Sequence, residues 1–456
     1  MTNDLMNKIV SLAKRRGFVF PGSEIYGGLA NTYDYGPLGA QLLKNLKDWW
    51  WERFVTTRPE IYGLETSILM NPKVWEASGH TKTFTDALIE CRKCHQRTRA
   101  DHLVSDNLNN VEVEGKPLEQ LDELIEKNRL KCPGCGAFAW TKAKKFNLLF
   151  ETKVGIVPES QSLAYLRGET AQGMFVDFKQ VLETMRPDLP FGLAQSGKAF
   201  RNEITKGKFT FRTLEFDLAE FEYFVRKEEW EKWFEYWKAE IWRFAVDIGV
   251  NKKRLRWRRQ TKEELSHYST RTEDLEYEFP FGFKEWLAVA YRTDFDLKNH
   301  MEKSGSDLRY TDPNTGEKFI PHVIEPTFGL SRSVVTVLVD AYSEIGDRIV
   351  LKLHPRLAPV TVAVFPLVRN KPEITAKAKQ VFDILKLRFR TGWDDRGNIG
   401  KRYYAQDEIG TPWCVTVDYD TLDNDTVTVR DRDSAKQERV AIGKLVEYIK
   451  LKLGME

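Results

Sequence analysis

The amino-acid sequence predicts an α/β protein of the α+β kind: an antiparallel-sheet domain with an inserted module, followed by a C-terminal α/β domain. Three observations support this prediction. Polar and apolar residues alternate over residues 199–224 around a Lys-Gly-Lys turn, which is typical of an antiparallel hairpin. Two cysteine pairs interrupt the pattern between residues 89 and 145. After a proline-rich linker at residues 353–360, strand-like and helical stretches alternate, which indicates a compact domain with a mixed sheet.

The composition is that of a multidomain globular protein. Its 456 residues correspond to roughly three domains, and 41% hydrophobic residues suffice for a sizeable core. No apolar run reaches the roughly 18–20 residues that span a bilayer, and the N-terminal stretch lacks the apolar segment of a secretory signal. We therefore expect a cytoplasmic protein that does not bind membranes. The net charge of +3 is nearly neutral, so nucleic-acid binding would need local patches.

Two long helices are expected in the large domain. Apolar residues recur at helical spacing over residues 38–54 and 228–246. Each stretch contains several tryptophans, which indicate core packing. The run of three tryptophans at residues 49–51 is expected to lie in the core or at a subunit interface, and ligand contact is the alternative.

Two strand-rich stretches are expected to complete that domain. Residues 275–297 read as strands that contain Glu285 and Arg292, and residues 322–342 run from a strand into a helix that Arg332 opens. A positive charge at a helix N-terminus is unfavourable with the helix dipole, so a bound anion there would explain Arg332.

The cysteines predict a structural metal site. Four of the five form C-x-x-C pairs, Cys91 with Cys94 and Cys132 with Cys135. Disulfides are disfavoured in a reducing compartment, and paired C-x-x-C units fit a tetrahedral zinc site made of four thiolates. Redox-active or metal-free cysteines are the alternative, although the sequence shows no catalytic neighbour for them. The fifth, Cys414, lies in an apolar run and is expected to be buried in a strand.

The hairpin at residues 199–224 is the first candidate ligand site. Arg201 and Arg212 flank its loop, and phenylalanines accompany them. Guanidinium groups pair with phosphate oxygens, and aromatic faces stack on flat bases, so this combination suits a nucleotide. A charged hairpin at a sheet edge is the alternative. For Glu169, a solvated loop glutamate is the alternative to a functional carboxylate.

Eight short motifs, in order along the chain, carry a resemblance. They are YGPLG (35–39), NPKVWEASGH (71–80), RADH (99–102), LRGETAQG (166–173), FRNE (200–203), EFDLAEFEYF (215–224), RTDFDL (292–297) and EPTFGLSR (325–332). Together they resemble the glycyl-tRNA synthetases of the homodimeric type, a class II aminoacyl-tRNA synthetase family. The resemblance covers nearly the whole chain, including a C-terminal part that is similar to the anticodon-binding domain of this group.

The resemblance implies a domain plan and a function. Residues 1–357 would form the class II catalytic domain, with a zinc-ribbon-like insertion at about 89–145, and residues 358–456 would form the anticodon-binding domain. The protein would use ATP to activate glycine and would transfer it to the 3′-terminal ribose of tRNA(Gly). It would act as a homodimer with structural Zn²⁺ and with Mg²⁺ accompanying ATP.

The family pattern also assigns site residues. The catalytic cations would be Arg201, Arg212 and Arg332. The ATP site would comprise Arg201, Asn202, Glu203, Phe211, Arg212, Phe216, Glu285, Trp286, Gly329 and Arg332. Glycine would be held by Arg99, Glu169, Phe216, Glu220, Glu325, Thr327 and Gly329. A further prediction rests on the loop itself: Lys206 and Lys208 lie on a loop long enough to extend, so we expect them to approach the acceptor end of the tRNA.

This sequence departs from the family pattern at four positions. Thr327 stands where serine is usual, Leu214 where arginine is common, and Leu287-Ala288 where a Glu-Gly pair is typical. Thr327 would change the pocket volume, Leu214 removes one expected positive charge, and Leu287-Ala288 would affect the placement of the metal. Two alternatives follow: a non-catalytic synthetase-like nucleic-acid-binding accessory protein, and the same chemistry with another amino acid. Exchange of ATP with diphosphate that depends on glycine would separate both alternatives from the main hypothesis.

Overall fold

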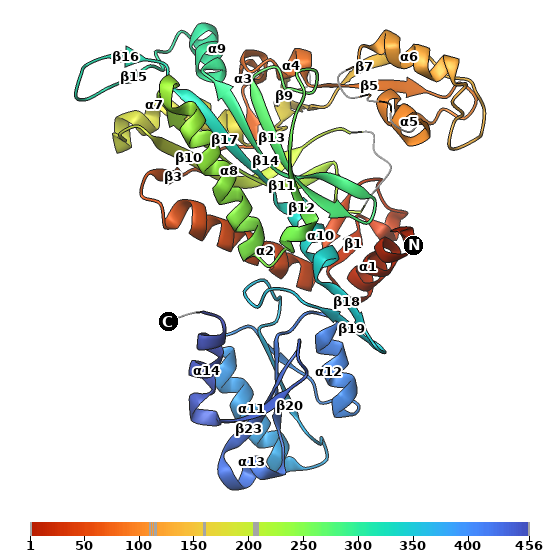
Figure 1. The fold of residues 1–456 in the computed structure, drawn as a ribbon, viewed down its shortest axis with the longest axis vertical. Coiled ribbons are helices and arrows are strands. Elements are labelled where there is room, and N and C mark those ends of the chain that lie inside the picture. The colour runs from red at the N-terminus through yellow and green to blue at the C-terminus, as the bar shows by residue number, and fades with distance from the viewer. Residues whose placement is uncertain are drawn as a thin grey trace.

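We describe the protein from a computed structural model. The structure describes residues 2–108, 111, 113, 116–157, 161–203 and 209–454. The chain forms a large lobe and a smaller lobe below it that holds the C-terminal end (Figure 1). None of the helices in these residues combines the length and apolarity needed to span a bilayer.

A seven-stranded sheet organises the large lobe. Its strand order is β12-β13-β14-β17-β11-β10-β3. Neighbouring strands run antiparallel except β3, which pairs in parallel with β10, so the predicted antiparallel sheet is confirmed. The strands are β3 (Ile61–Gly63), β10 (Phe191–Phe200), β11 (Glu215–Val225), β12 (Leu255–Arg259), β13 (Arg271–Phe279), β14 (Gly282–Thr293) and β17 (His322–Gly329).

Helices cover one face of this sheet and form the main core. They are α1 (Thr2–Arg16), α2 (Pro37–Trp51), α8 (Trp230–Asp247) and α10 (Leu330–Ala341). Figure 1 shows α8 lying along the sheet, with α2 and α10 below it. Trp50 and Trp237 are fully buried between helices and sheet, which confirms the predicted helices and the core packing of these tryptophans. Trp51, in contrast, is 37% exposed.

The opposite face is covered at one end only. Helices α7 (Ala171–Met185) and α9 (Phe295–Ser304) pack there against Phe191, Phe224 and Val323. The next residues along the strands on this face are polar, including Glu220 and Thr327, which are register partners on β11 and β17. The sheet therefore presents a polar floor beside an apolar end.

The hairpin of β10 and β11 is confirmed as antiparallel, but its second strand is shorter than predicted. Pairing ends at Phe200 with Glu215, so residues 211–214 lie in the connection and not in the strand. There the Leu214 amide donates to the Asn31 carbonyl at 3.1 Å, and its carbonyl accepts from the Arg201 amide at 2.9 Å. These bonds replace the sheet ladder. Lys206 and Lys208 lie outside the described residues.

The inserted module has its own small sheet. Its strands are β5 (Thr85–Glu90), β6 (Arg97–Arg99) and β7 (Lys144–Asn147), in the order β6-β5-β7, and its helices are α5 (Ala100–Asn107) and α6 (Leu118–Lys127). The polar helix predicted in the middle of the insertion is α6. A separate apolar cluster, which includes Leu103, Leu121 and Ile125, holds the module together.

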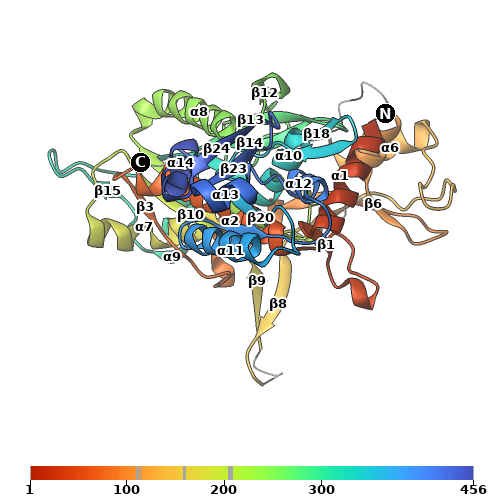
Figure 2. The same ribbon diagram turned by 90° about the horizontal axis from the view of Figure 1, so that it is seen from below.

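Short elements connect these parts. A hairpin of β8 (Phe150–Val154) and β9 (Ser162–Leu166) projects from the large lobe (Figure 2). The others are β1 (Val19–Pro21), β2 (Tyr33–Tyr35), β4 (Leu69–Met70), α3 (Pro72–Ala77), α4 (His80–Thr83), β15 (Tyr310–Thr311), β16 (Lys318–Phe319), β18 (Tyr342–Ile345) and β19 (Arg348–Leu351).

The C-terminal lobe is the predicted compact α/β unit. Its sheet has the order β21-β20-β22-β23-β24 and is mixed, with parallel β20–β21 and β20–β22 pairs and antiparallel pairs beyond. Cys414 is buried in β22, as predicted. The elements are β20 (Val362–Pro366), α11 (Pro372–Lys386), β21 (Thr391–Trp393), α12 (Ile399–Asp407), β22 (Trp413–Val417), α13 (Tyr419–Asn424), β23 (Thr426–Asp431), β24 (Gln437–Ala441) and α14 (Leu445–Lys452).

Candidate active site

Most of the predicted ATP-site residues line one region above the sheet. Two adjoining cavities of about 100 and 450 Å³ share Phe211, Arg212, Glu285 and Arg332. The smaller cavity is also lined by Arg201, Glu203, Phe216, Trp286, Thr327 and Gly329. The larger one extends towards the insertion. The sheet thus brings together residues that are more than a hundred positions apart in the chain.

Arg332 lies in the first turn of α10 and is held from two sides. One of its guanidinium nitrogens, Nη1, donates to the Glu285 carbonyl at 2.7 Å and lies 3.2 Å from the Glu285 carboxylate. Its guanidinium also lies over the Phe211 ring, 4.6 Å from the centroid. Burial alone would raise the pKa of Glu285. The positive charges of the neighbouring arginines, of which Arg332 has the largest effect, outweigh burial and lower this pKa.

The other two predicted catalytic arginines stand nearby. Arg201 donates to the Gly168 carbonyl at 3.0 Å, and its guanidinium lies 5.4 Å from the centroid of the Phe216 ring. Arg212 lies 3.3 Å from Oε2 of Glu203, a carboxylate oxygen that makes no hydrogen bond within the described part of the chain. The region therefore combines three cations with a buried carboxylate and an aromatic face.

Two residues predicted for the ATP site, Trp286 and Asn202, make contacts outside the arginine cluster. The Trp286 indole is buried in the core and donates from Nε1 to the Ser333 hydroxyl at 2.9 Å. A register shift between Leu275 and Glu276, opposite this position, turns Trp286 to the helix side while Glu285 faces the cavity. Asn202 makes a backbone contact, donating from its amide to the Leu148 carbonyl at 2.8 Å.

A second cluster, deeper on the same face, gathers buried carboxylates. It contains Glu169, Glu220 and Glu325, each at most 5% exposed. Thr170 donates to Glu220 from its amide at 2.9 Å and from its hydroxyl at 2.5 Å. Three of the acids predicted from the sequence to hold an amino acid are thus brought together.

Arg292 is the centre of this cluster, and the site residues predicted from the sequence did not include it. It is fully buried and reaches Glu325 at 2.7 Å, Asp296 at 2.8 Å and Glu169 at 3.5 Å. Tyr268 lies across it, with its ring centroid 3.7 Å from the guanidinium carbon. The cluster of acids raises the pKa of Arg292 well above its ordinary value despite its burial.

Glu222 adds a further acid that sequence reasoning missed. It is fully buried, and neither of its carboxylate oxygens has a hydrogen-bond partner among the described residues. Burial raises the pKa of Glu222, and the nearby Glu325 raises it further. Its position could have been found from the strand alternation, since Glu220 and Glu222 are two residues apart on β11 and share a face.

The cluster holds more acids than cations. Burial raises the pKa of Glu325, and burial together with the charge of Glu169 raises that of Glu220. Glu169 behaves oppositely: His80 and Arg292 outweigh the effect of burial and lower its pKa. Unpartnered carboxylate oxygens around a single arginine form an environment that an additional cationic group would stabilise.

Arg99 lies apart from this cluster. It is in β6 of the insertion, where its guanidinium contacts Asp86 at 2.8 Å and Asp101 at 2.6 Å. The charge of Glu203 contributes to the raised pKa of Arg99, so Arg99 lies near the predicted ATP-site residues. Both ends of its guanidinium are thus engaged by neighbouring carboxylates.

Comparison with known proteins gives close relatives over nearly the full length. The chain is 50% identical to glycine–tRNA ligases of Caldanaerobacter subterraneus subsp. tengcongensis and Clostridium tetani, and 49% identical to that of Geobacillus thermodenitrificans. Each alignment covers 98% of this chain and 97–98% of the relative. The chain belongs to the glycine–tRNA ligase family. The expected class II synthetase resemblance is thereby confirmed, and nothing supports the alternative of a non-catalytic accessory protein.

A family model adds the identity of the smaller lobe. Residues 361–452 match the model described as "Anticodon binding domain". This match agrees with the anticodon-binding domain expected at the C-terminal end of a glycine–tRNA ligase family member.

The four paired cysteines of this family member converge on one point. The thiols of Cys91, Cys94, Cys132 and Cys135 all lie within 4.8 Å of one another. The Sγ–Sγ distance is 3.7 Å for Cys91 with Cys135 and 3.6 Å for Cys94 with Cys132. Four cysteine sulfurs at these spacings fit the tetrahedral thiolate site that zinc prefers. Metal-free cysteines would not need to converge in this way.

Proposed function

We propose that this protein is a glycine–tRNA ligase. It activates glycine with ATP to give glycyl-adenylate and diphosphate, and then transfers glycine to the 3′-terminal ribose of tRNA(Gly). One observation carries the proposal: a buried carboxylate cluster around Arg292 lies on the same sheet face as the arginine cluster of Arg201, Arg212 and Arg332. The first suits an ammonium group, and the second suits phosphates.

The arginine cluster would bind ATP. Arg201 would contact the α-phosphate, Arg212 the nucleotide, and Arg332 the far phosphates, since guanidinium groups pair strongly with phosphate oxygens. Phe216 would stack on adenine, and Glu203 would accept from its amino group. The Glu203 carboxylate lines the smaller cavity, which supports this assignment. Asn202, Phe211, Glu285 and Gly329 would complete the pocket, and the buried Trp286 would support it from the core.

The carboxylate cluster would bind glycine. Glu169, Glu220 and Glu325 would surround the ammonium, with Thr327 and Gly329 closing the pocket beside Phe216. A side chain on Gly329 would meet Arg332 at 3.3 Å and the Trp286 carbonyl at 3.6 Å, so this position is tight. Glycine offers only its ammonium and carboxylate for recognition. Arg99 remains a candidate only for the adjoining ATP side.

Activation needs positioning and not a general base. An oxygen of the ionised glycine carboxylate attacks the α-phosphorus, forming a P–O bond while the bond to the leaving diphosphate breaks. The negative charge that develops on the phosphoryl oxygens would be neutralised by the catalytic cations Arg201, Arg212 and Arg332. Holding the carboxylate and the phosphate in line is the protein's main contribution.

Two metals belong to the proposal. Zn²⁺ would be bound by Cys91, Cys94, Cys132 and Cys135 and would hold the insertion together. Mg²⁺ would accompany ATP and neutralise phosphate charge, with Glu285 among its ligands. Glu276 is the register partner of Glu285 and lines the same cavity, so oxygen donors of the type that Mg²⁺ prefers are present.

The partners follow from the reaction. The anticodon-binding lobe would contact tRNA(Gly), and the hairpin loop with Lys206 and Lys208 would reach its acceptor end. We also propose that the protein is a cytoplasmic homodimer, with catalytic and anticodon-binding domains that divide at residues 357 and 358.

Exchange of labelled diphosphate into ATP tests the proposal. We expect exchange that depends on glycine and that alanine and serine do not support, followed by charging of tRNA(Gly). Exchange with a different amino acid would assign the same chemistry to another substrate. Absence of exchange with every amino acid, in folded protein supplied with Mg²⁺, would overturn the proposal.

A further inference from the structure

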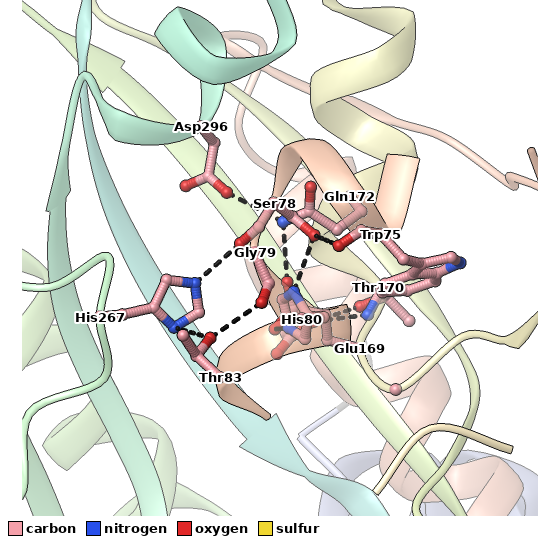
Figure 3. Close-up of polar contacts among 12 residues, drawn as sticks. Trp75, Ser78, Gly79, His80, Thr83, Glu169, Thr170, Gln172, His267 and Asp296 are labelled. Carbon is pink, nitrogen blue, oxygen red and sulfur yellow. Dashed lines mark hydrogen bonds and ion pairs between the residues drawn. The ribbon is translucent and has the colours of Figure 1, made fainter. Parts of the chain in front are cut away.

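We propose that His80 is a positioning residue of the amino-acid site, whose Nε2–H holds the carboxylate of Glu169 in its working orientation. This inference rests on the proposed function. His80 begins α4 and is 1% exposed, and its Nε2 lies 3.2 Å from Oε2 of Glu169 (Figure 3). It lies in the NPKVWEASGH motif, which the assigned site residues left without a role.

The contact fixes which ring nitrogen carries a proton. The pKa of Glu169 is lowered, so its carboxylate is ionised and can only accept hydrogen bonds. The Nε2 that faces it must therefore be protonated. The other ring nitrogen, Nδ1, lies 2.8 Å from the Ser78 hydroxyl. Whether Ser78 donates to Nδ1 or accepts from it, Nε2 remains the donor to Glu169.

Within the described part of the chain, His80 alone holds Oε2 of Glu169. The other oxygen, Oε1, accepts from Gln172 at 2.9 Å and lies 3.5 Å from Arg292. Among the described residues, the hydrogen bonds and ion pairs of Oε2 involve His80 alone. The His80 contact therefore sets the rotation of the carboxylate about its last bond, and with it the oxygen that an ammonium would meet.

The ring is itself held on several sides. Trp75 and Phe84 meet it edge-on, with ring centroids 5.4 and 5.1 Å away. A second histidine fixes the Ser78 segment: partial burial lowers the pKa of His267, and the neutral ring donates from Nε2 to the Ser78 carbonyl at 2.7 Å. The Nδ1 of His267 lies 3.0 Å from the Thr83 hydroxyl, which itself donates to the Gly79 carbonyl at 2.9 Å (Figure 3).

This arrangement predicts a specific effect on glycine. Glu169 lies between His80 and Arg292, so loss of the Nε2–H would let its carboxylate rotate towards the arginine. A hydrogen bond to a charged group contributes about 1.5–3 kcal/mol, which corresponds to roughly a tenfold to hundredfold change in affinity. Among the described residues, His80 makes no hydrogen bond or ion pair with Arg201, Arg212 or Arg332 and is joined to Arg201 only through the Phe84 ring, so ATP binding should be unaffected.

Two substitutions separate the roles of the two nitrogens. Glutamine at position 80 can reach the Nε2 position with an amide N–H, whereas asparagine reaches only the Nδ1 position. We expect His80→Asn to raise the KM for glycine about tenfold or more in diphosphate exchange, and His80→Gln to restore most of it. The KM for ATP should stay unchanged in both. The matched control is His354→Gln, because His354 is a partly buried histidine and lies beside Trp49. This substitution should change neither KM.

The outcomes distinguish the inference from the function on which it rests. An equal rise in the glycine KM for both variants, or equal rises for glycine and ATP, would overturn the role of His80. Thermal melts identify variants that do not fold, and for those Ser78→Ala gives the second measurement, with an expected smaller rise in the glycine KM. Wild-type protein that shows no exchange with glycine would instead count against the proposed function.

Discussion

Glu222 faces Glu325 across β11 and β17, between the register pairs Glu220–Thr327 and Tyr223–Ile324. The two side chains are buried, and in the described residues Arg292 reaches Glu325 but leaves both oxygens of Glu222 without a hydrogen bond. Two acids opposite each other in a water-poor site cannot both ionise without cost. Protonation of this pair therefore affects both the charge of the proposed amino-acid site and the stability of the sheet.

A pH dependence of stability follows from this pair. Burial raises the pKa of Glu222 well above the ordinary value of 4.5, so the folded protein retains a proton that the unfolded chain releases. Its stabilising contribution is complete below about pH 4.5 and is lost as the pH rises towards the folded-state pKa. We expect Glu222→Gln to weaken the decline of the melting temperature with rising pH above 4.5. Identical pH profiles for the variant and the wild type would contradict this.

Removal of Arg292 should destabilise the fold strongly. Arg292→Met leaves the acids around it without their buried cation, and breaking such a pair costs about 3–5 kcal/mol. Urea denaturation would measure the loss in the free energy of unfolding. Arg309→Met is the matched control, because Arg309 is 45% exposed and, among the described residues, pairs only with Asp307, so its loss should change the free energy of unfolding far less. Equal losses would show that the cluster does not depend on Arg292.

Arg332 should affect the reaction more than the fold. It is held by the Glu285 carbonyl and lies over Phe211, so Arg332→Lys keeps a positive charge but loses the planar fork. We expect Arg332→Gln to lower the kcat of diphosphate exchange about 10²–10³-fold, and Arg332→Lys to recover part of it. Arg226→Gln, on a surface pair with Asp312, controls for general effects. Unchanged kcat in Arg332→Gln would remove this arginine from the catalytic group.

The insertion should depend on its metal. We expect one zinc per chain in protein purified without chelator, and less in Cys132→Ser. Chelation should speed amide exchange in β5 and β6 while the seven-stranded sheet stays protected, since the insertion has its own apolar cluster. Mutation of Cys414, buried in β22 of the other lobe, is the control for cysteine loss. Full protection of the insertion after zinc removal would contradict the structural role.

Local patterns predicted the elements of this protein better than its site. The cysteine pairs were predicted to form one cluster. C-x-x-C spacing brings the two sulfurs of each pair together, and a zinc site of four thiolates needs both pairs. The strand alternation of β11 was also predicted, yet its start at Glu215 was not. There the chain follows hydrogen bonds to Asn31, which is distant in sequence, and no local pattern encodes that partner.

The centre of the proposed amino-acid site was predicted only in part. Glu169, Glu220 and Glu325 were assigned from motifs, but Arg292, which contacts two of them, was seen only as a residue inside a strand. Its role depends on the register of β14 with β17, where Ala290 pairs with Glu325. Trp286 borders the smaller cavity, but a bulge turns its indole to the helix side of the sheet, which the sequence did not predict.

Alternate residues of strand β11 face opposite sides of the sheet and have different roles. Phe221 and Tyr223 belong to the aromatic core under α8, while Glu220 and Glu222 lie on the opposite face, which carries the proposed substrate site. A single-residue insertion or deletion in this strand would exchange the two sets, placing carboxylates among tryptophans and aromatic rings in the ammonium site. Natural variation within β11 should therefore proceed by substitution only, and its length should be as constrained as its chemistry.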